Sequence, residues 1–126
     1  MIAAHPRCEY PGTVCDEFVY LHDLMSAFLQ VAGLASSDVP DSQSILANVL
    51  GHQAPTGRES IYACFESQVF SFRQRMVRTR EYKLTYNHSH IGELYDLVHD
   101  PWEMRDLMDL PQTRAVQGSL LAQMRE

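Results

Sequence analysis

The sequence predicts a mixed fold of the α/β to α+β class, built from two portions of different character. Apolar residues recur at helical spacing after Asp23, whereas Tyr82 to Tyr86 alternates as a strand does. The stretch from His52 to Gly57 reads as a long loop between these two patterns. We therefore expect one portion at 1–55 and a second at 56–126, within a chain whose 126 residues suit one ordinary domain.

The first portion is expected to contain one strand and two helices. Glu17 to Leu21 alternates in polarity and includes aromatic and β-branched residues, which predicts a short strand. Asp23 is a suitable N-cap for the helix that follows, and Gly33 is a suitable end. Four residues of this helix share an apolar stripe that is expected to pack in a core: Met25, Phe28, Leu29 and Ala32. A second, shorter helix is expected over 45–50.

The second portion is expected to be rich in short strands, at residues 60–65, 76–79, 82–86 and 93–97, with the middle two joined as a hairpin. The turn at Arg80 and Glu81 lacks Gly and Asn, which favours a turn longer than two residues. The segment from Asp100 to Glu103 has the residue types of a helix start. Residues 112–124 carry a weak apolar stripe.

Composition and charge exclude several classes of partner. The formal net charge of −6 argues against a general nucleic-acid binder and against an anionic membrane surface, because both need positive potential on the protein. No apolar run approaches the length that crosses a bilayer. With 45% apolar and 21% charged residues, the chain has the composition of a globular protein. We expect no nucleic-acid and no membrane partner.

The cysteines do not form a disulfide framework, because Cys8, Cys15 and Cys64 are an odd number. Cys8 and Cys15 have the option of pairing with each other. Three free, mostly buried thiols is the interpretation that we favour.

Two separate motifs, in the right order, resemble the closing part of sulfatases. Residues 75–87, RMVRTREYKLTYN, followed by residues 93–107, ELYDLVHDPWEMRDL, look like the hairpin and the "ELYDL..DP.E..NL" segment with which that family commonly ends. Residues 23–33, DLMSAFLQVAG, are similar to its "DLMPTFLDLAG" helix. Ser26 and Ala27 replace the usual Pro-Thr, and both are compatible with a first helical turn.

This resemblance implies an architecture and an activity. Residues 1–55 would be the end of a large α/β sulfatase domain, and residues 56–126 would be the smaller C-terminal subdomain, an antiparallel sheet with a packed helix. The intact family hydrolyses sulfate esters with a formylglycine, made from Cys or Ser within C/S-x-P-x-R, and with a divalent cation that we expect to be calcium. The partner implied for this chain is the missing N-terminal sulfatase domain, or another chain, held through an apolar face.

The sequence lacks the reacting groups of that family. No Cys or Ser begins a C/S-x-P-x-R motif, and no adjacent Asp pair is present to start a cation site. We therefore expect no catalytic residue, no metal ligand and no cofactor in this chain, and we expect it to be inactive alone. Calcium and formylglycine are expected only in the intact family enzyme.

His88 and His90 are the most suggestive polar cluster. In an extended segment both would point the same way, as in some metal sites, but no third ligand lies nearby in the sequence. Two solvated loop histidines is the plain interpretation. The resemblance places this subdomain near a substrate cleft, so His88 and His90 are also our candidates for contact with a sulfated substrate.

Two further clusters each allow a functional and a structural interpretation. Five basic residues fall within eleven positions, and we favour the solvated face of a hairpin over a patch for anionic substrates: Arg73, Arg75, Arg78, Arg80 and Lys83. Four aromatic residues are expected to pack in a small core, in preference to forming a carbohydrate platform: Tyr82, Tyr86, Tyr95 and Trp102.

The leading hypothesis is thus the C-terminal part of a sulfatase-type hydrolase, which supplies structure and contacts at the substrate rim. The alternative is a stand-alone, non-catalytic interaction module that pairs with another chain through an exposed apolar face.

Overall fold

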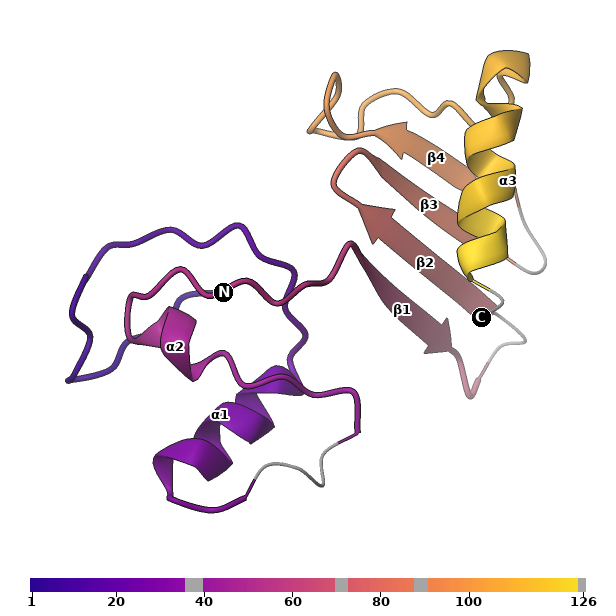
Figure 1. Ribbon diagram of the computed structural model, residues 1–126. Helices are drawn as coiled ribbons and strands as arrows, with labels where there is room; N and C mark the ends of the chain where they lie inside the picture. The colour runs from indigo at the N-terminus through magenta and orange to yellow at the C-terminus, as the bar shows by residue number, and fades with distance from the viewer. Residues whose placement is uncertain (36–39, 70–72, 88–90, 125–126) are drawn as a thin grey trace. The chain divides into compact units, whose positions relative to one another are not determined.

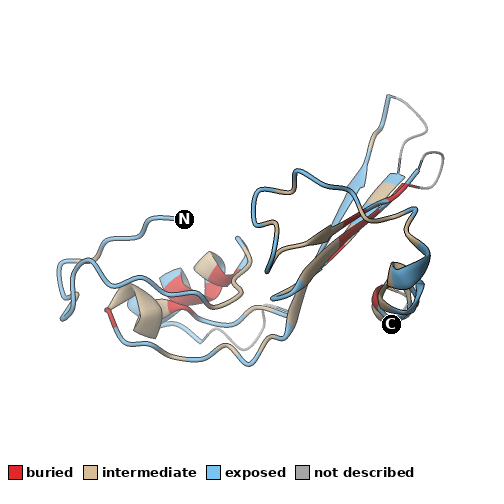
Figure 2. Ribbon diagram, turned by 90° about the horizontal axis from the view of Figure 1, so that it is seen from above, coloured by how far each residue is buried: buried red, intermediate tan, exposed pale blue. Residues whose placement is uncertain are grey.

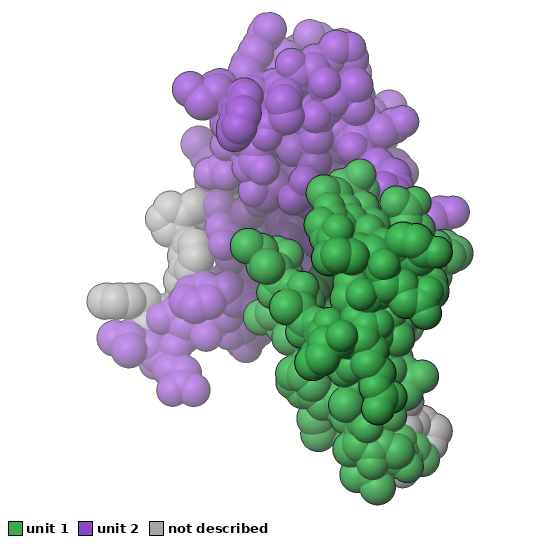
Figure 3. All heavy atoms as spheres, turned by 90° about the vertical axis from the view of Figure 1, so that its left-hand side faces the viewer, with its two compact units in different colours: residues 1–58 green, residues 59–126 purple. Residues whose placement is uncertain are grey.

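The computed structural model describes residues 1–35, 40–69, 73–87 and 91–124 (Figure 1). The chain divides into two compact units, unit 1 at Met1–Arg58 and unit 2 at Glu59–Glu126 (Figure 3). The division follows directly after the loop at which the sequence changes character. None of the described helices has the length and hydropathy of a bilayer span.

Unit 1 contains two helices, α1 (Asp23–Val31) and α2 (Leu46–Val49), linked by irregular segments. The strand expected at Glu17–Leu21 is absent from these described residues, so that prediction was wrong. A strand needs a neighbour for its backbone groups, and the described part of unit 1 provides none. The Phe18 carbonyl accepts hydrogen bonds from the side chains of Thr56 and Arg58 instead.

Helix α1 forms where the sequence predicted it, but it buries a different face. Asp23, Ser26 and Ala27 are its buried residues, whereas Met25 and Phe28 are 53% and 65% exposed (Figure 2). The expectation that the apolar stripe packs in a core was wrong for this chain, because the described residues of unit 1 do not cover it. Unit 1 therefore presents an apolar helix face to solvent.

Unit 2 is a four-stranded antiparallel sheet with a helix on one face, and it confirms the predicted fold of the second portion (Figure 1). The strands follow one another in the order β1-β2-β3-β4. Their bounds are β1 Ser60–Glu66, β2 Arg73–Thr79, β3 Tyr82–Asn87 and β4 Glu93–Asp96. A short 3-10 helix at Pro111–Thr113 leads into α3 (Arg114–Gln123).

The core of unit 2 follows from strand alternation. Val77 lies opposite Leu84, and Leu84 lies opposite Leu94, so one row of apolar side chains crosses the sheet on one face. All three are fully buried, and Leu120 of α3 joins them at 4% exposure. In Figure 2 the buried stretches of the sheet are drawn in red. The sheet and α3 thus share one small hydrophobic cluster.

The segment after β4 forms a turn in place of the expected helix. Glu103 adopts φ +56°, a left-handed conformation that is incompatible with an α-helix. The Asp100 carbonyl accepts a hydrogen bond from Glu103 N at 3.1 Å, and its carboxylate accepts one from Arg105 N at 2.8 Å. This turn leaves Trp102 83% exposed, so the prediction that Trp102 packs in a core was wrong.

Candidate functional site

A buried ion pair holds unit 1 together. The carboxylate of Asp23 is fully buried and accepts two hydrogen bonds from the Arg58 guanidinium, at 2.5 and 2.9 Å. Arg58 also donates to the carbonyls of Phe18 and Asp41 and lies over the Tyr20 ring, 4.8 Å from its centroid. We call Asp23 and Arg58 the clamp, because they join three segments that are distant in sequence.

The clamp changes the ionisation of Asp23. Burial by itself raises the pKa of this carboxyl, but hydrogen bonds from Arg58 and from the backbone N–H groups of Gln43 and Tyr20 outweigh it and lower the pKa to about 2. The same pairing raises the pKa of Arg58. Both groups therefore stay charged near neutral pH, which suits a structural tie and not proton transfer.

The sequence interpretation missed this pair. Asp23 was expected to cap α1, yet it is the first residue of the helix. The capping position is occupied by His22, whose side chain makes no capping hydrogen bond. Arg58 lies at the end of what reads as a linker. The one signal available was that no charged residue occurs from Ser42 to Gly57, which makes an arginine directly after this stretch unusual.

The predicted substrate-contact residues, His88 and His90, lie outside the described residues. The base of their loop is described. The Asn87 side chain is nearly buried, donates to the Ile91 carbonyl at 2.9 Å and accepts from the Gln74 side chain at 2.9 Å. Asn87, at the end of β3, is therefore linked to Ile91, which lies two residues before β4.

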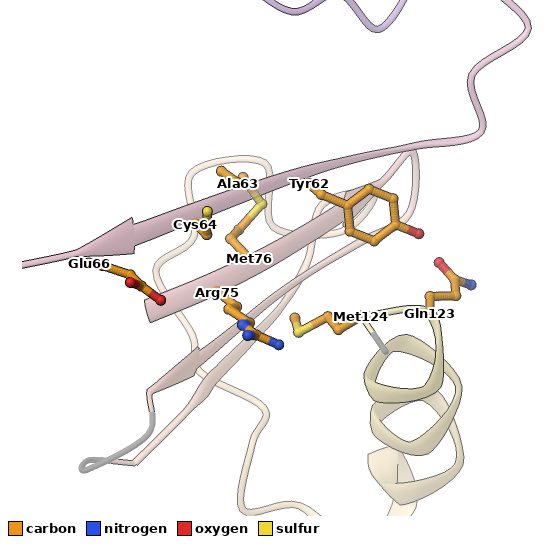
Figure 4. Close-up of a pocket in the computed structure, with 8 residues that line it drawn as sticks. All are labelled: Tyr62, Ala63, Cys64, Glu66, Arg75, Met76, Gln123 and Met124. Atoms are coloured by element: carbon orange, nitrogen blue, oxygen red, sulfur yellow. The ribbon is translucent and has the colours of Figure 1, made fainter. Parts of the chain in front are cut away.

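A pocket of about 470 Å³ lies in unit 2 between β1, β2 and the end of α3 (Figure 4). Its lining combines apolar surface with a few polar groups, from Tyr62, Ala63, Cys64, Glu66, Arg75, Met76, Gln123 and Met124. Figure 4 shows the side chains of Arg75 and Met124 extending toward one another. The lining offers a carboxylate, a cation and a thiol beside apolar surface, which gives it the character of a binding surface.

The basic cluster does not form one continuous patch in the structure. Arg73 approaches Glu66 at 3.7 Å, and Lys83 pairs with Glu103 at 2.5 Å. Arg75 and Arg78 are three residues apart on β2, so they point to opposite faces of the sheet. This arrangement agrees with the solvated-hairpin interpretation.

The cysteines are free, as favoured from the sequence, but Cys15 and Cys64 are exposed instead of buried. Cys64 is exposed because it belongs to β1, the edge strand of the sheet. Among the described residues, no three His, Cys, Asp or Glu side chains gather where a metal ion would bind.

The fold of unit 2 is shared with sulfatase-type hydrolases of known structure. A 2-O GAG sulfatase matches with TM-score 0.71 at 24% identity, over 82% of this chain and 23% of that protein. The phosphonate monoester hydrolase of Agrobacterium radiobacter matches with TM-score 0.68 at 16% identity, over 86% of this chain and 24% of that protein. A structure in complex with its substrate, D-glucosamine-2-N,6-O-disulfate, matches with TM-score 0.65 at 23% identity, over 82% of this chain and 22% of that protein.

Sequence comparison gives the family. The pattern described as "N-sulphoglucosamine sulphohydrolase, C-terminal" matches residues 1–126, and the chain belongs to this family. It is 37% identical over 113 residues to an uncharacterized protein of Haemophilus influenzae, which covers 87% of this chain and 56% of that one. It is 22% identical over 157 residues to the ulvan-active sulfatase of Formosa agariphila, which covers 98% of this chain and 31% of that one. The chain thus spans about half or less of the length of these relatives.

Proposed function

We propose that this chain serves as the C-terminal part of a sulfatase-type hydrolase, in which the attacking group and the cation site come from polypeptide outside this sequence. The observation that carries the proposal is the family match over residues 1–126, in a sequence that contains no C/S-x-P-x-R motif. On this proposal unit 1 is the end of the large α/β domain, and unit 2 is the C-terminal subdomain.

The exposed apolar face of α1 supports this assignment. A soluble chain rarely leaves several large apolar side chains of one helix in water, and such a surface is usually covered by a partner. Met25, Phe28 and Val31 are all more than half exposed. We propose that the preceding sulfatase domain covers them in the intact protein, with unit 1 contributing structure and no chemistry.

The part of unit 2 that we assign to substrate contact is the loop of His88 and His90, which Asn87 anchors. Imidazole N–H groups donate hydrogen bonds to sulfate or hydroxyl oxygens. In our proposal these side chains contact the non-reacting part of a sulfated substrate. Two relatives, a 2-O GAG sulfatase and the ulvan-active sulfatase, carry names that place sulfated polysaccharides among the classes to test first.

A titration of the chain with a sulfated monosaccharide tests the rim role, read by NMR as amide shift changes. The expected result is a set of changes centred on the amides of Asn87 and Ile91, with none for the unsulfated sugar. Replacing both His88 and His90 with alanine should remove these changes and leave the other resonances in place. Shifts that are absent, or that persist in the double variant, would contradict the rim assignment.

The alternative is a stand-alone module that pairs with another chain through the same apolar face of α1. Binding of a hydrophobic dye separates the covered from the uncovered state. Both readings predict that the isolated chain binds the dye and that Phe28→Ser reduces the signal. Only the first predicts that a sulfatase N-terminal domain removes it.

A further inference from the structure

Arg75 lines the pocket of unit 2 and differs from the basic residues beside it in having no counter-charge. On the same strand Arg73 approaches Glu66 at 3.7 Å, and on the next strand Lys83 pairs with Glu103. Arg75, by contrast, makes no ion pair and no side-chain hydrogen bond with any residue that the structure describes. Its guanidinium is therefore available to a ligand.

The register of the sheet places Arg75 on the face against which α3 packs. Val77 and Leu120 of α3 belong to one core cluster, and Arg75, two residues before Val77 on β2, points to the same face. Helix α3 ends at Gln123, and the pocket lies at this end, where the side chains of Arg75 and Met124 extend toward one another (Figure 4). All of the lining residues belong to unit 2, so this unit forms the pocket by itself.

The lining of this pocket is suited to a small organic anion. The volume of about 470 Å³ lies within the range of small-molecule sites, about 300–1,000 Å³. Met76 and Met124 provide apolar contacts, and methionine side chains adapt to ligands of different shape. Glu66 is balanced by Arg73, so Arg75 leaves one positive charge uncompensated. An occupant with an apolar body and one negative charge would complement both features.

We propose that this pocket binds a small amphipathic monoanion, whose carboxylate or sulfate-like head pairs with the Arg75 guanidinium and whose apolar body lies against Met124. A planar guanidinium donates two parallel N–H groups to such a head. A phosphate monoester is less suitable, because it carries close to two negative charges at neutral pH and Glu66 lines the same pocket. This binding is non-covalent and does not depend on the proposed function.

Three compounds with the same ring system test the proposal: 2-naphthoate, naphthalene-2-sulfonate and the neutral 2-naphthylmethanol. In NMR titrations of the full chain, both anions should cause saturable shifts at the amides of Cys64, Arg75 and Met124, and the tighter anion identifies the preferred head. The neutral compound should bind about fivefold more weakly or less, because it lacks the charge-assisted hydrogen bonds. Shifts that are absent at these amides or confined to α1, or equal binding of the neutral compound, would overturn the proposal.

Two variants that change the charge of the pocket in opposite directions separate a loss of binding from a loss of fold. Arg75→Gln should weaken binding of the anions by about tenfold, because it removes the cation. Glu66→Gln should strengthen binding by about twofold at low salt, because it removes a carboxylate from the lining, and misfolding cannot produce a gain. The matched control is Arg78→Gln, which removes a cation from the other face of β2 and should leave binding unchanged. Equal effects of Arg75→Gln and Arg78→Gln, or weaker binding in Glu66→Gln, would refute the role of Arg75.

Discussion

Replacing Arg58 with methionine removes one half of the clamp and leaves the buried carboxylate of Asp23 without its counter-charge. Four hydrogen bonds disappear, two to Asp23 and one each to the carbonyls of Phe18 and Asp41. Loss of one partner from a buried ion pair costs about 3–5 kcal/mol. A small unit has little stability beyond this, so we expect α1 to open locally.

Hydrogen exchange read by mass spectrometry measures this effect unit by unit. In Arg58→Met, amides of α1 and of the segment at Gln43 should exchange about a hundredfold faster or more, which corresponds to the lower end of that energy range. Peptides from unit 2 should be unchanged. The matched control is Arg73→Met, which removes the exposed pair with Glu66 and should change exchange only slightly. Equal effects of the two variants would refute the structural role of the clamp.

Three further predictions concern single residues. The pKa of Asp23 is lowered from an ordinary 3.8 to about 2 in the folded chain, so its ionised carboxylate contributes about 2 kcal/mol to the free energy of unfolding. This contribution is complete above pH 3.8 and is lost as the pH falls toward 2. Urea unfolding followed by circular dichroism at each pH measures it, and stability that stays flat from pH 5 to about 2 would contradict it. Gly92→Ala should lower the melting temperature, because the new Cβ would lie 2.8 Å from the Thr85 carbonyl oxygen. Gly118→Ala, in helix α3, meets nothing within 4 Å and should stabilise the fold by about 0.5–1 kcal/mol. The opposite order of melting temperatures would be inconsistent with the described packing. Asn87→Ala should cost about 1–3 kcal/mol in thermal unfolding, because it removes the hydrogen bonds that the nearly buried Asn87 side chain makes with the Gln74 side chain and the Ile91 carbonyl; a neutral result would count against this role.

The elements of unit 2 were predictable because their signals are local. Alternation in Tyr82–Tyr86 identified a strand and its two faces. The expectation of a turn longer than two residues was wrong, because β2 ends at Thr79 and β3 begins at Tyr82, which leaves only Arg80 and Glu81 between them. The Thr79 hydroxyl accepts hydrogen bonds from the backbone N–H groups of Glu81 and Tyr82, which supports this short turn without Gly or Asn. Strand patterns of this kind depend on pairing between strands that follow one another in the sequence, and this chain contains all of those strands.

The failures involve partners that are distant in sequence or absent from it. Glu17–Leu21 has the residues of a strand, but the described sheet consists of β1 to β4 and does not include it. The clamp joins Asp23 to Arg58 across the length of unit 1, and no periodicity indicates such a contact. The residues from Asp100 have the pattern of a helix start, but Glu103 adopts a left-handed conformation that ends it. The Glu103 carboxylate pairs with Lys83 on β3, a contact that is distant in sequence.

The candidate site was predictable only in part. The lack of a nucleophile motif is a property of the sequence alone. The assignment of His88 and His90 stays a prediction, with the described anchor at Asn87 as its structural support. The pocket beside Arg75 has no sequence signal, because β1, β2 and α3 meet there only after folding.

Sulfate-ester turnover by the purified chain decides whether the reacting group lies in this sequence. Supplied with calcium and a fluorogenic aryl sulfate, the chain should hydrolyse no more than a buffer blank, while an intact sulfatase in the same assay is active. Hydrolysis that exceeds the blank and is abolished by replacing Cys8, Cys15 or Cys64 would contradict it, because the reacting group would then lie in this chain.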